Sequence, residues 1–128
     1  MQYPTLFLLA TTAFSMASAL PSINLGSYTF PSGGQLIAWD ASISSKDACN
    51  QHSIVTGSDG GPAPPRCGTA FTLDGISDLS LTCLSDGETI VGVALNGTQV
   101  ETCSSVVVDG TYCTDGVELT QTYACVPV

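Results

Sequence analysis

The sequence predicts an all-β fold, built as a small disulfide-stabilised β-sandwich or barrel. Tight-turn dipeptides are the first reason, because five Asp-Gly pairs and one Asn-Gly pair recur between residues 59 and 116. Glycine tolerates positive φ, and Asp or Asn can hydrogen-bond to its own backbone, so these pairs favour hairpin turns. Short segments of β-favouring residues between the turns are the second reason. The third is that no helical period competes from residue 67 onward.

The first third of the expected domain is less regular than the rest. Residues 34–41 are expected to form a strand that carries Trp39, the only tryptophan. Ser44 and Asp47 have the spacing of a capping box, which predicts a short helix near residues 45–52. An ordinary polar loop is the alternative for this segment.

Alternation of apolar and polar side chains supports the strands that follow. Leu79 and Leu81 are expected on one side of their strand, with Ser80 and Thr82 on the other, as in a sheet with one buried face. Residues 89–95 are apolar on both faces, as in a buried central strand. The expected strands are residues 69–73, 78–84, 89–95, 98–103, 105–108 and 117–126.

Residues 1–19 have the pattern of a signal peptide. Residues 6–13 form a largely apolar run, and Ala17 and Ala19 place small side chains at the third and first positions before the expected cut. The run is shorter than the roughly 20 apolar residues that a membrane-spanning helix needs. We therefore expect a secreted, extracellular and monomeric protein with a single domain over residues 20–128 and no membrane attachment.

Six cysteines lie in the expected mature domain. In a secreted chain an even number of cysteines indicates disulfides, each typically worth about 2–4 kcal/mol of stability. Zinc is not favoured, because the closest two cysteines have nine residues between them and His52 is the only histidine. Residues 57–65 hold three glycines and three prolines, which predicts a loop. A Cys49–Cys67 bridge would tether that loop, although six cysteines allow about 15 connectivities. The cysteines are Cys49, Cys67, Cys83, Cys103, Cys113 and Cys125.

The chain is strongly acidic, with a formal net charge of −9 and only Lys46 and Arg66 as basic residues. Such a charge repels phosphate backbones and anionic lipid headgroups, which disfavours nucleic-acid binding and membrane lysis. The sequence holds no nucleophile elbow, no calcium-loop spacing and no nucleotide-binding fingerprint. No pair of carboxylates stands out for glycoside hydrolysis. We therefore expect no catalysis, no metal and no cofactor.

Two features mark candidate functional surfaces. The Asn-Gly-Thr sequence at Asn96 satisfies the N-glycosylation rule in an expected exposed turn, so Asn96 is a candidate glycosylation site. His52 and Arg66 lie toward the two ends of the segment between the first two cysteines, and Trp39 is either a core residue or a partner anchor. We group these three as a candidate partner-binding loop, because tethered loops lose less entropy on binding.

Three short motifs accompany this composition: Phe-Thr-Leu-Asp-Gly at residues 71–75, Leu-Thr-Cys at 81–83 and Tyr-Ala-Cys at 123–125. With the signal peptide and the even cysteine set, this layout resembles the small secreted cysteine-rich proteins of filamentous fungi. The resemblance implies an effector-like interaction protein that acts at a host or competitor surface without catalysis. Its partner would be a host or competitor protein or a cell-wall glycan. A secreted toxin or antimicrobial protein, and a small cell-wall polysaccharide hydrolase or binder, are the alternatives.

Overall fold

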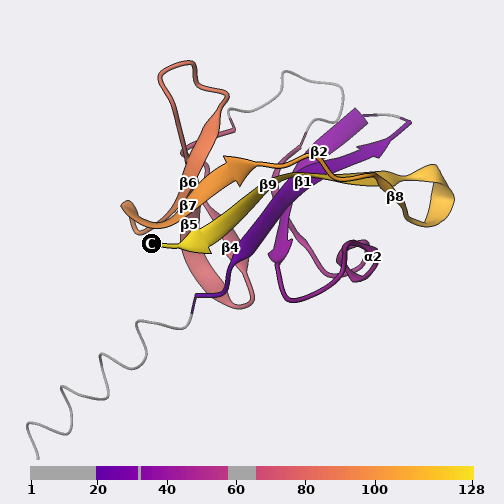
Figure 1. The fold of residues 1–128 in the computed structure, drawn as a ribbon, viewed down its shortest axis with the longest axis horizontal. Helices are drawn as coiled ribbons and strands as arrows, with labels where there is room; N and C mark the ends of the chain where they lie inside the picture. Colours follow the sequence, from indigo (N-terminus) through magenta and orange to yellow (C-terminus); the bar gives the residue numbers. More distant parts are fainter. Residues whose placement is uncertain (1–19, 32, 58–65) are drawn as a thin grey trace, which may run out of the picture.

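The structure, a computed structural model, describes residues 20–31, 33–57 and 66–128, in which antiparallel strands dominate (Figure 1). The strands form one sheet that curls into a nearly closed barrel, so the predicted all-β class is confirmed. The strands are β1 Ile23–Phe30, β2 Gly33–Asp40, β3 Ser53–Gly57, β4 Phe71–Leu73, β5 Ile76–Cys83, β6 Ile90–Leu95, β7 Thr98–Ser105, β8 Thr111–Tyr112 and β9 Glu118–Pro127. The helical elements are α2 Ser45–Ala48 and the 3-10 turn η1 Thr114–Gly116.

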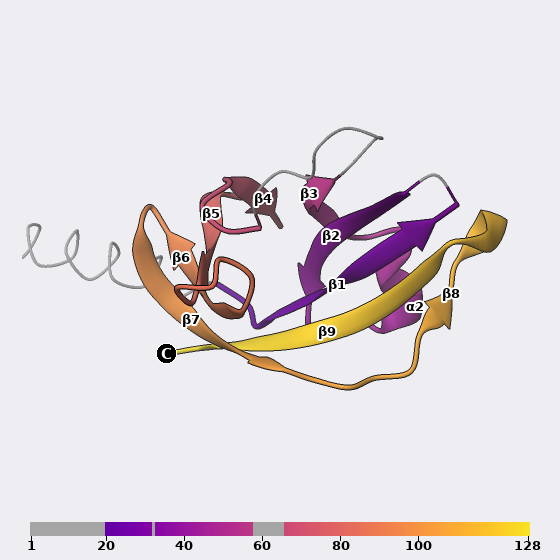
Figure 2. The same ribbon diagram turned by 90° about the horizontal axis from the view of Figure 1, so that it is seen from above.

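The strand order explains how the barrel closes. Along the ladder the order is β3-β2-β1-β9-β7-β6-β5-β4, with β8 also pairing with β9. The last strand, β9, therefore lies between β1 and β7 and joins the first three strands to the next four (Figure 2). Strands β3 and β4 end the ladder and lie side by side. We call this junction of β3 and β4 the seam.

Two hairpins are closed by dipeptides that the sequence predicts as turns. Asp74-Gly75 connects β4 to β5, and Asn96-Gly97 connects β6 to β7. All four residues have positive φ, at 52°, 79°, 51° and 83° respectively. Two-residue loops with positive φ at both positions are type I′ turns, whose twist matches that of the flanking strands. These dipeptides therefore set the register of both hairpins.

Apolar side chains from both halves of the sheet fill the inside of the barrel. Strand β5 follows the predicted alternation, since Leu79 and Leu81 are buried and Ser80 and Thr82 are partly exposed. We call the buried set the inner cluster. It consists of Ile23, Leu25, Leu36, Ala38, Val55, Phe71, Leu73, Leu79, Leu81, Ile90, Val93, Cys103 and Cys125.

A second apolar cluster lies on the opposite face of β1, β2 and β9, against α2. Ile37 and Trp39 of β2 belong to it, while the residues between and before them point into the barrel, so β2 is buried on both faces. Strand β1 approaches Trp39 closely at Gly26. A Cβ atom at Gly26 would lie 2.5 Å from the Thr120 carbonyl oxygen and 3.0 Å from the Trp39 ring. Only glycine fits here. The outer cluster consists of Ile37, Trp39, Ala48 and Leu119.

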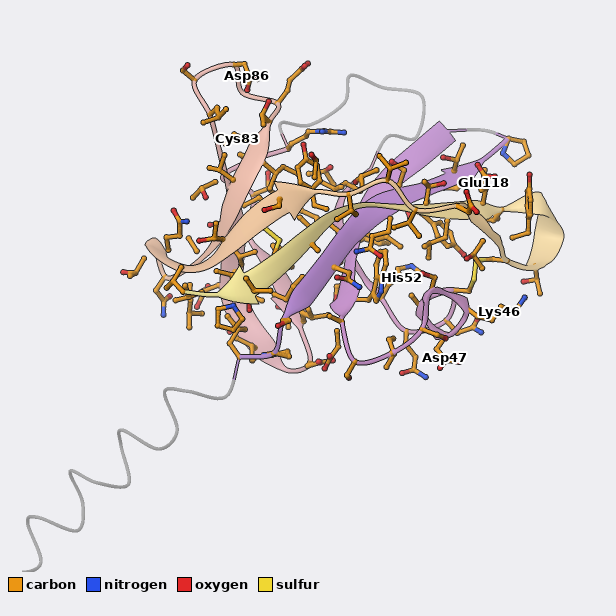
Figure 3. All side chains as sticks on the ribbon, viewed as in Figure 1. Lys46, Asp47, His52, Cys83, Asp86 and Glu118 are labelled. Atoms are coloured by element: carbon orange, nitrogen blue, oxygen red, sulfur yellow. A yellow bond between two sulfur atoms is a disulfide. The ribbon has the colours of Figure 1, made fainter. Side chains whose placement is uncertain are left out.

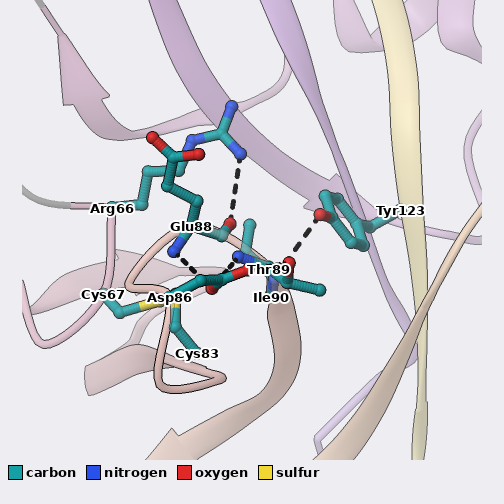
Figure 4. Close-up of a disulfide and its surroundings, with 8 residues drawn as sticks. All are labelled: Arg66, Cys67, Cys83, Asp86, Glu88, Thr89, Ile90 and Tyr123. Carbon is teal, nitrogen blue, oxygen red and sulfur yellow. Dashed lines mark hydrogen bonds between the residues drawn. A yellow bond between two sulfur atoms is a disulfide. The ribbon is translucent and has the colours of Figure 1, made fainter.

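All six cysteines form disulfides, as the sequence predicts, but the expected Cys49–Cys67 pairing is wrong. Cys67 lies beside the end of β5 instead, where the neighbouring Gly68 N–H donates to the Leu81 carbonyl at 3.1 Å. This position places Cys67 against Cys83 (Figure 4). Three disulfides are typical of an extracellular protein. The pairs are Cys49–Cys113, Cys67–Cys83 and Cys103–Cys125.

Other local expectations are met in part. Helix α2 begins as predicted, because the Ser44 hydroxyl accepts a hydrogen bond from the Asp47 N–H at 3.1 Å, but it ends at Ala48 rather than near residue 52. Residues 105–108 do not form a separate strand, since β7 runs to Ser105 and the next strand begins at Thr111. The predicted signal peptide and most of the predicted 57–65 loop lie outside the described residues. Within the described part, no helix has the length and apolarity needed to cross a membrane.

Candidate functional site

A pocket of about 400 Å³ opens where the end of β2 meets the seam. Asp40 ends β2, and Asp74 occupies the turn between β4 and β5. His52 and Ser53 lead from α2 into β3 and form the remaining side. The lining holds two carboxyl groups and no lysine or arginine. The residues around the pocket are Asp40, Ile43, Gln51, His52, Ser53, Leu73 and Asp74.

The carboxyl groups of Asp40 and Asp74 form a hydrogen-bonded pair. The Ser42 backbone N–H donates to Asp40 Oδ1 at 2.9 Å, and this bond, with help from the Ser42 side chain and from Asp74, lowers the pKa of Asp40. Burial, the hydrogen bond to Asp40 and the charge of Asp40 raise the pKa of Asp74. Two adjacent carboxyl groups do not ionise independently, so ionisation of Asp40 disfavours ionisation of Asp74.

His52 lines the same pocket and is held in a fixed orientation. Its Nδ1 lies 2.6 Å from the Ala48 carbonyl oxygen, which can only accept, so Nδ1 carries a hydrogen and donates it. The ring also packs against Tyr28, with ring centroids 4.8 Å apart. The remaining ring nitrogen, Nε2, is therefore the acceptor of a neutral His52.

A covalent tether supports the segment that carries His52. The disulfide Cys49–Cys113 joins the residue after α2 to the residue after β8. Lys46 Nζ adds a hydrogen bond to the Tyr112 carbonyl at 3.3 Å, on the far side of α2 from His52 (Figure 3). The positive charge of Lys46 is thus directed away from the pocket, and the pocket wall is fixed before any ligand arrives.

Comparison with protein-family models, curated proteins and solved structures finds no match. The function therefore has to be inferred from the pocket and its surroundings. In the described ranges, no group of three or more His, Cys, Asp or Glu side chains is arranged to hold a metal ion. The pocket is thus characterised by its carboxyl pair rather than by a set of metal ligands.

The structure separates the three residues of the candidate partner-binding loop. His52 lines the pocket, whereas Trp39 is completely buried in the outer cluster and offers no surface to a partner. Arg66 lies beside the Cys67–Cys83 bridge, where its Nη1 donates to the Glu88 carbonyl at 3.4 Å (Figure 4). Only His52 therefore belongs to the candidate site.

Asn96 lies where the sequence places it, in the exposed turn between β6 and β7. Its positive φ of 51° belongs to the type I′ turn, and the following strand begins at Thr98, the third residue of the glycosylation sequence. The turn leaves the Asn96 side chain accessible to a modifying enzyme.

The sequence did not identify Asp40 and Asp74 as neighbours in one pocket. Turn chemistry already explains an Asp before Gly75, and Asp40 simply ends a strand. Their proximity depends on β2 and β4 meeting across the seam. In the sheet, β9 lies between the strands that lead to β2 and the strands that lead to β4. No local sequence pattern indicates this position of β9.

Proposed function

We propose that this chain is a secreted, effector-like binding protein that acts at a host or competitor surface without catalysis. We further propose that the pocket of Asp40, Asp74 and His52 receives a lysine or arginine side chain of a partner protein. The observation that supports this most is the hydrogen-bonded carboxyl pair in a pocket lined by no lysine or arginine.

Electrostatics favours a cationic group in this pocket. Burial, the hydrogen bond to Asp40 and the charge of Asp40 raise the pKa of Asp74 in this pocket. A guanidinium or ammonium group placed between the two carboxyl groups would favour ionisation of both. It would then form charge-assisted hydrogen bonds, which are roughly twice as strong as neutral ones. A net charge of −9 would also steer basic partners toward the protein.

The geometry favours binding over glycoside hydrolysis. Glycosidases hold their two carboxyl groups about 5–9.5 Å apart, so that a sugar or a water molecule fits between them. Asp40 and Asp74 instead interact directly through a hydrogen bond. The rigid, disulfide-tethered scaffold also suits a binding protein, because little conformational freedom is lost when a partner docks.

Titration calorimetry with short blocked peptides tests this proposal. The peptides carry arginine, lysine or citrulline, the last being a neutral analogue of arginine. We expect the arginine and lysine peptides to bind and the citrulline peptide not to bind. The double variant Asp40→Asn/Asp74→Asn should bind at least about tenfold more weakly, because each charged hydrogen bond is worth roughly 1.5–3 kcal/mol.

The control variant is Glu88→Gln/Asp109→Asn, which likewise replaces two carboxyl groups by amides, at two exposed positions outside the pocket. Equal weakening by the two double variants would assign binding to overall charge and contradict the proposal. If a soluble cell-wall oligosaccharide binds and the basic peptides do not, the partner is a glycan and the proposed protein partner is wrong.

A further inference from the structure

Glu101 is a carboxyl group enclosed inside the barrel. It lies on β7 and is 0% exposed, and neither carboxylate oxygen has a hydrogen-bond partner of normal geometry in the described structure. Its register partners are Val93 on β6 and Pro127 on β9. Cys103, the next residue on the same face of β7, belongs to the inner cluster. Glu101 thus occupies a position that the surrounding strands fill with apolar side chains.

An ionised carboxylate is costly at such a position. Moving a charge out of water without a partner destabilises the folded chain, and a carboxyl group responds by keeping its proton. Burial raises the pKa of Glu101 to about 7, and the Ile23 backbone N–H opposes this shift only in part. The neutral form is therefore the one that the folded barrel accommodates.

No lysine, arginine or histidine lies on β1, β6, β7 or β9 to pair with Glu101. Strand β6 carries no titratable residue, and β1 carries only Tyr28, toward its far end from Ile23. On β9 the titratable residues are Glu118, at its start, and Tyr123, whose hydroxyl accepts from the Ile90 N–H at 3.4 Å. Asp78 on β5 is exposed, and Asp40 on β2 is the register partner of Ile23.

The last residues of β9 and the residue after them lie beside Glu101 and are exposed. Val126 and Val128 are 56% and 80% exposed, and the Val128 N–H donates to the Val100 carbonyl at 3.0 Å as the outermost bond of this ladder. The Cys103–Cys125 disulfide fixes the strands just inside this point. Opening of residues 126–128 would let water reach Glu101 while the rest of β9 stays in place.

We propose that Glu101 is a pH sensor within the barrel. In acid its neutral carboxyl group is compatible with the closed barrel. At neutral pH its ionisation admits water, by releasing the end of β9 beyond the Cys103–Cys125 bridge. Through Glu101, the folded barrel gains stability in an acidic environment relative to neutral pH.

The direction of the pH effect follows from the two states of the chain. The unfolded chain releases the proton near pH 4.5 and the folded chain near pH 7, so the folded state binds the proton more tightly. The contribution of Glu101 to stability is complete below pH 4.5 and is lost as the pH rises to about 7. The equilibrium constant for unfolding should rise by up to about 300-fold over this interval from Glu101 alone.

Urea unfolding of the mature protein between pH 4 and pH 8 tests the proposal. We expect Glu101→Gln to remove this pH-dependent component, because the amide has a similar shape and cannot ionise. Glu88→Gln, an exposed control, should retain it. If Glu101→Gln retains the full pH dependence of the wild-type protein, the proposal is overturned.

A measurement on the wild-type protein keeps the test valid even if the variant does not fold. The carboxyl carbon of Glu101 can be followed by NMR as the pH is raised. We expect a midpoint near 7, accompanied by faster exchange of the Val128 amide after correction for intrinsic rates. A midpoint near 4.5 would overturn the proposal. Signal cleavage before Leu20 would create a new α-ammonium group at the start of the mature chain. If this charge keeps Glu101 ionised throughout the titration, the proposal is also overturned.

Discussion

Asp40 and Asp74 share a hydrogen bond between two strands that no backbone ladder joins. Asp40 ends β2 and Asp74 belongs to the turn after β4, so the bond spans the place where the barrel closes. This hydrogen bond therefore connects the two sides of the barrel at its closure, and the same two residues form the proposed binding site.

Replacing Asp74 by asparagine should change stability in a pH-dependent way. The amide of Asp74→Asn can donate to Asp40 without a titrating proton. In the wild type the pKa of Asp74 is raised, so its contribution is present below the unfolded value of 3.8 and is lost as the pH rises through the folded value. The melting temperature of the variant minus that of the wild type should therefore be more positive at pH 7 than at pH 4. A difference of equal size at the two pH values would contradict the shared proton.

Gly26 should not tolerate even a methyl group. A Cβ in Gly26→Ala would meet the Thr120 carbonyl at 2.5 Å and the Trp39 ring at 3.0 Å, so one strand has to shift. We expect a loss of about 1–3 kcal/mol in urea unfolding. Gly34→Ala is the matched control, because its Cβ would lie 3.8 Å from its nearest neighbour, the Tyr28 carbonyl. It should change stability by no more than about 0.5 kcal/mol. Equal losses in the two variants would contradict the close packing of β1 on Trp39.

The disulfides should differ in what they contribute. Cys49–Cys113 closes a loop with a sequence separation of 64, whereas Cys67–Cys83 closes one of 16. Loop-closure entropy predicts losses of about 4 and about 3 kcal/mol when each pair is replaced by serine. Only the Cys49–Cys113 variant should also weaken peptide binding, because that bridge tethers the segment before His52. Urea unfolding measures the stability of both double variants, and calorimetric titration measures their peptide binding. Unchanged peptide binding without Cys49–Cys113 would show that the pocket does not need the tether.

Asn96 should carry a glycan when the chain is secreted by a eukaryotic host. The turn exposes its side chain, and Thr98 completes the acceptor sequence. Mass spectrometry before and after enzymatic deglycosylation should show a mass loss in the wild type and none in Thr98→Ala. An unmodified Asn96 in the secreted wild-type protein would be the contrary result.

Local chemistry accounts for the part of the fold that the sequence predicts. The type I′ turns at Asp74-Gly75 and Asn96-Gly97 depend on two residues each, and the burial of β5 depends on its own alternation. The N-cap of α2 likewise needs only Ser44 and Asp47. These signals act over a few residues and are therefore visible without knowledge of the fold.

Long-range packing accounts for what the sequence does not predict. Strands β1 and β3 were missed. The central position of β1 depends on Gly26 meeting a tryptophan from another strand, and β3 is an edge strand that pairs with β2 in the part of the chain that the structure describes. Glu101 reads as an ordinary polar residue of an alternating strand until the barrel encloses it. The carboxyl pair similarly exists only because the seam brings Asp40 to Asp74.

Carboxyl-carbon NMR during addition of a blocked arginine amide tests the binding proposal most directly. The titration is run at a pH where Asp74 is still protonated. We predict that the arginine probe shifts the Asp74 signal to its ionised position and releases a proton, while the citrulline analogue does neither. If the arginine probe leaves the signals of Asp40 and Asp74 unchanged, the pocket is not the binding site for a basic side chain.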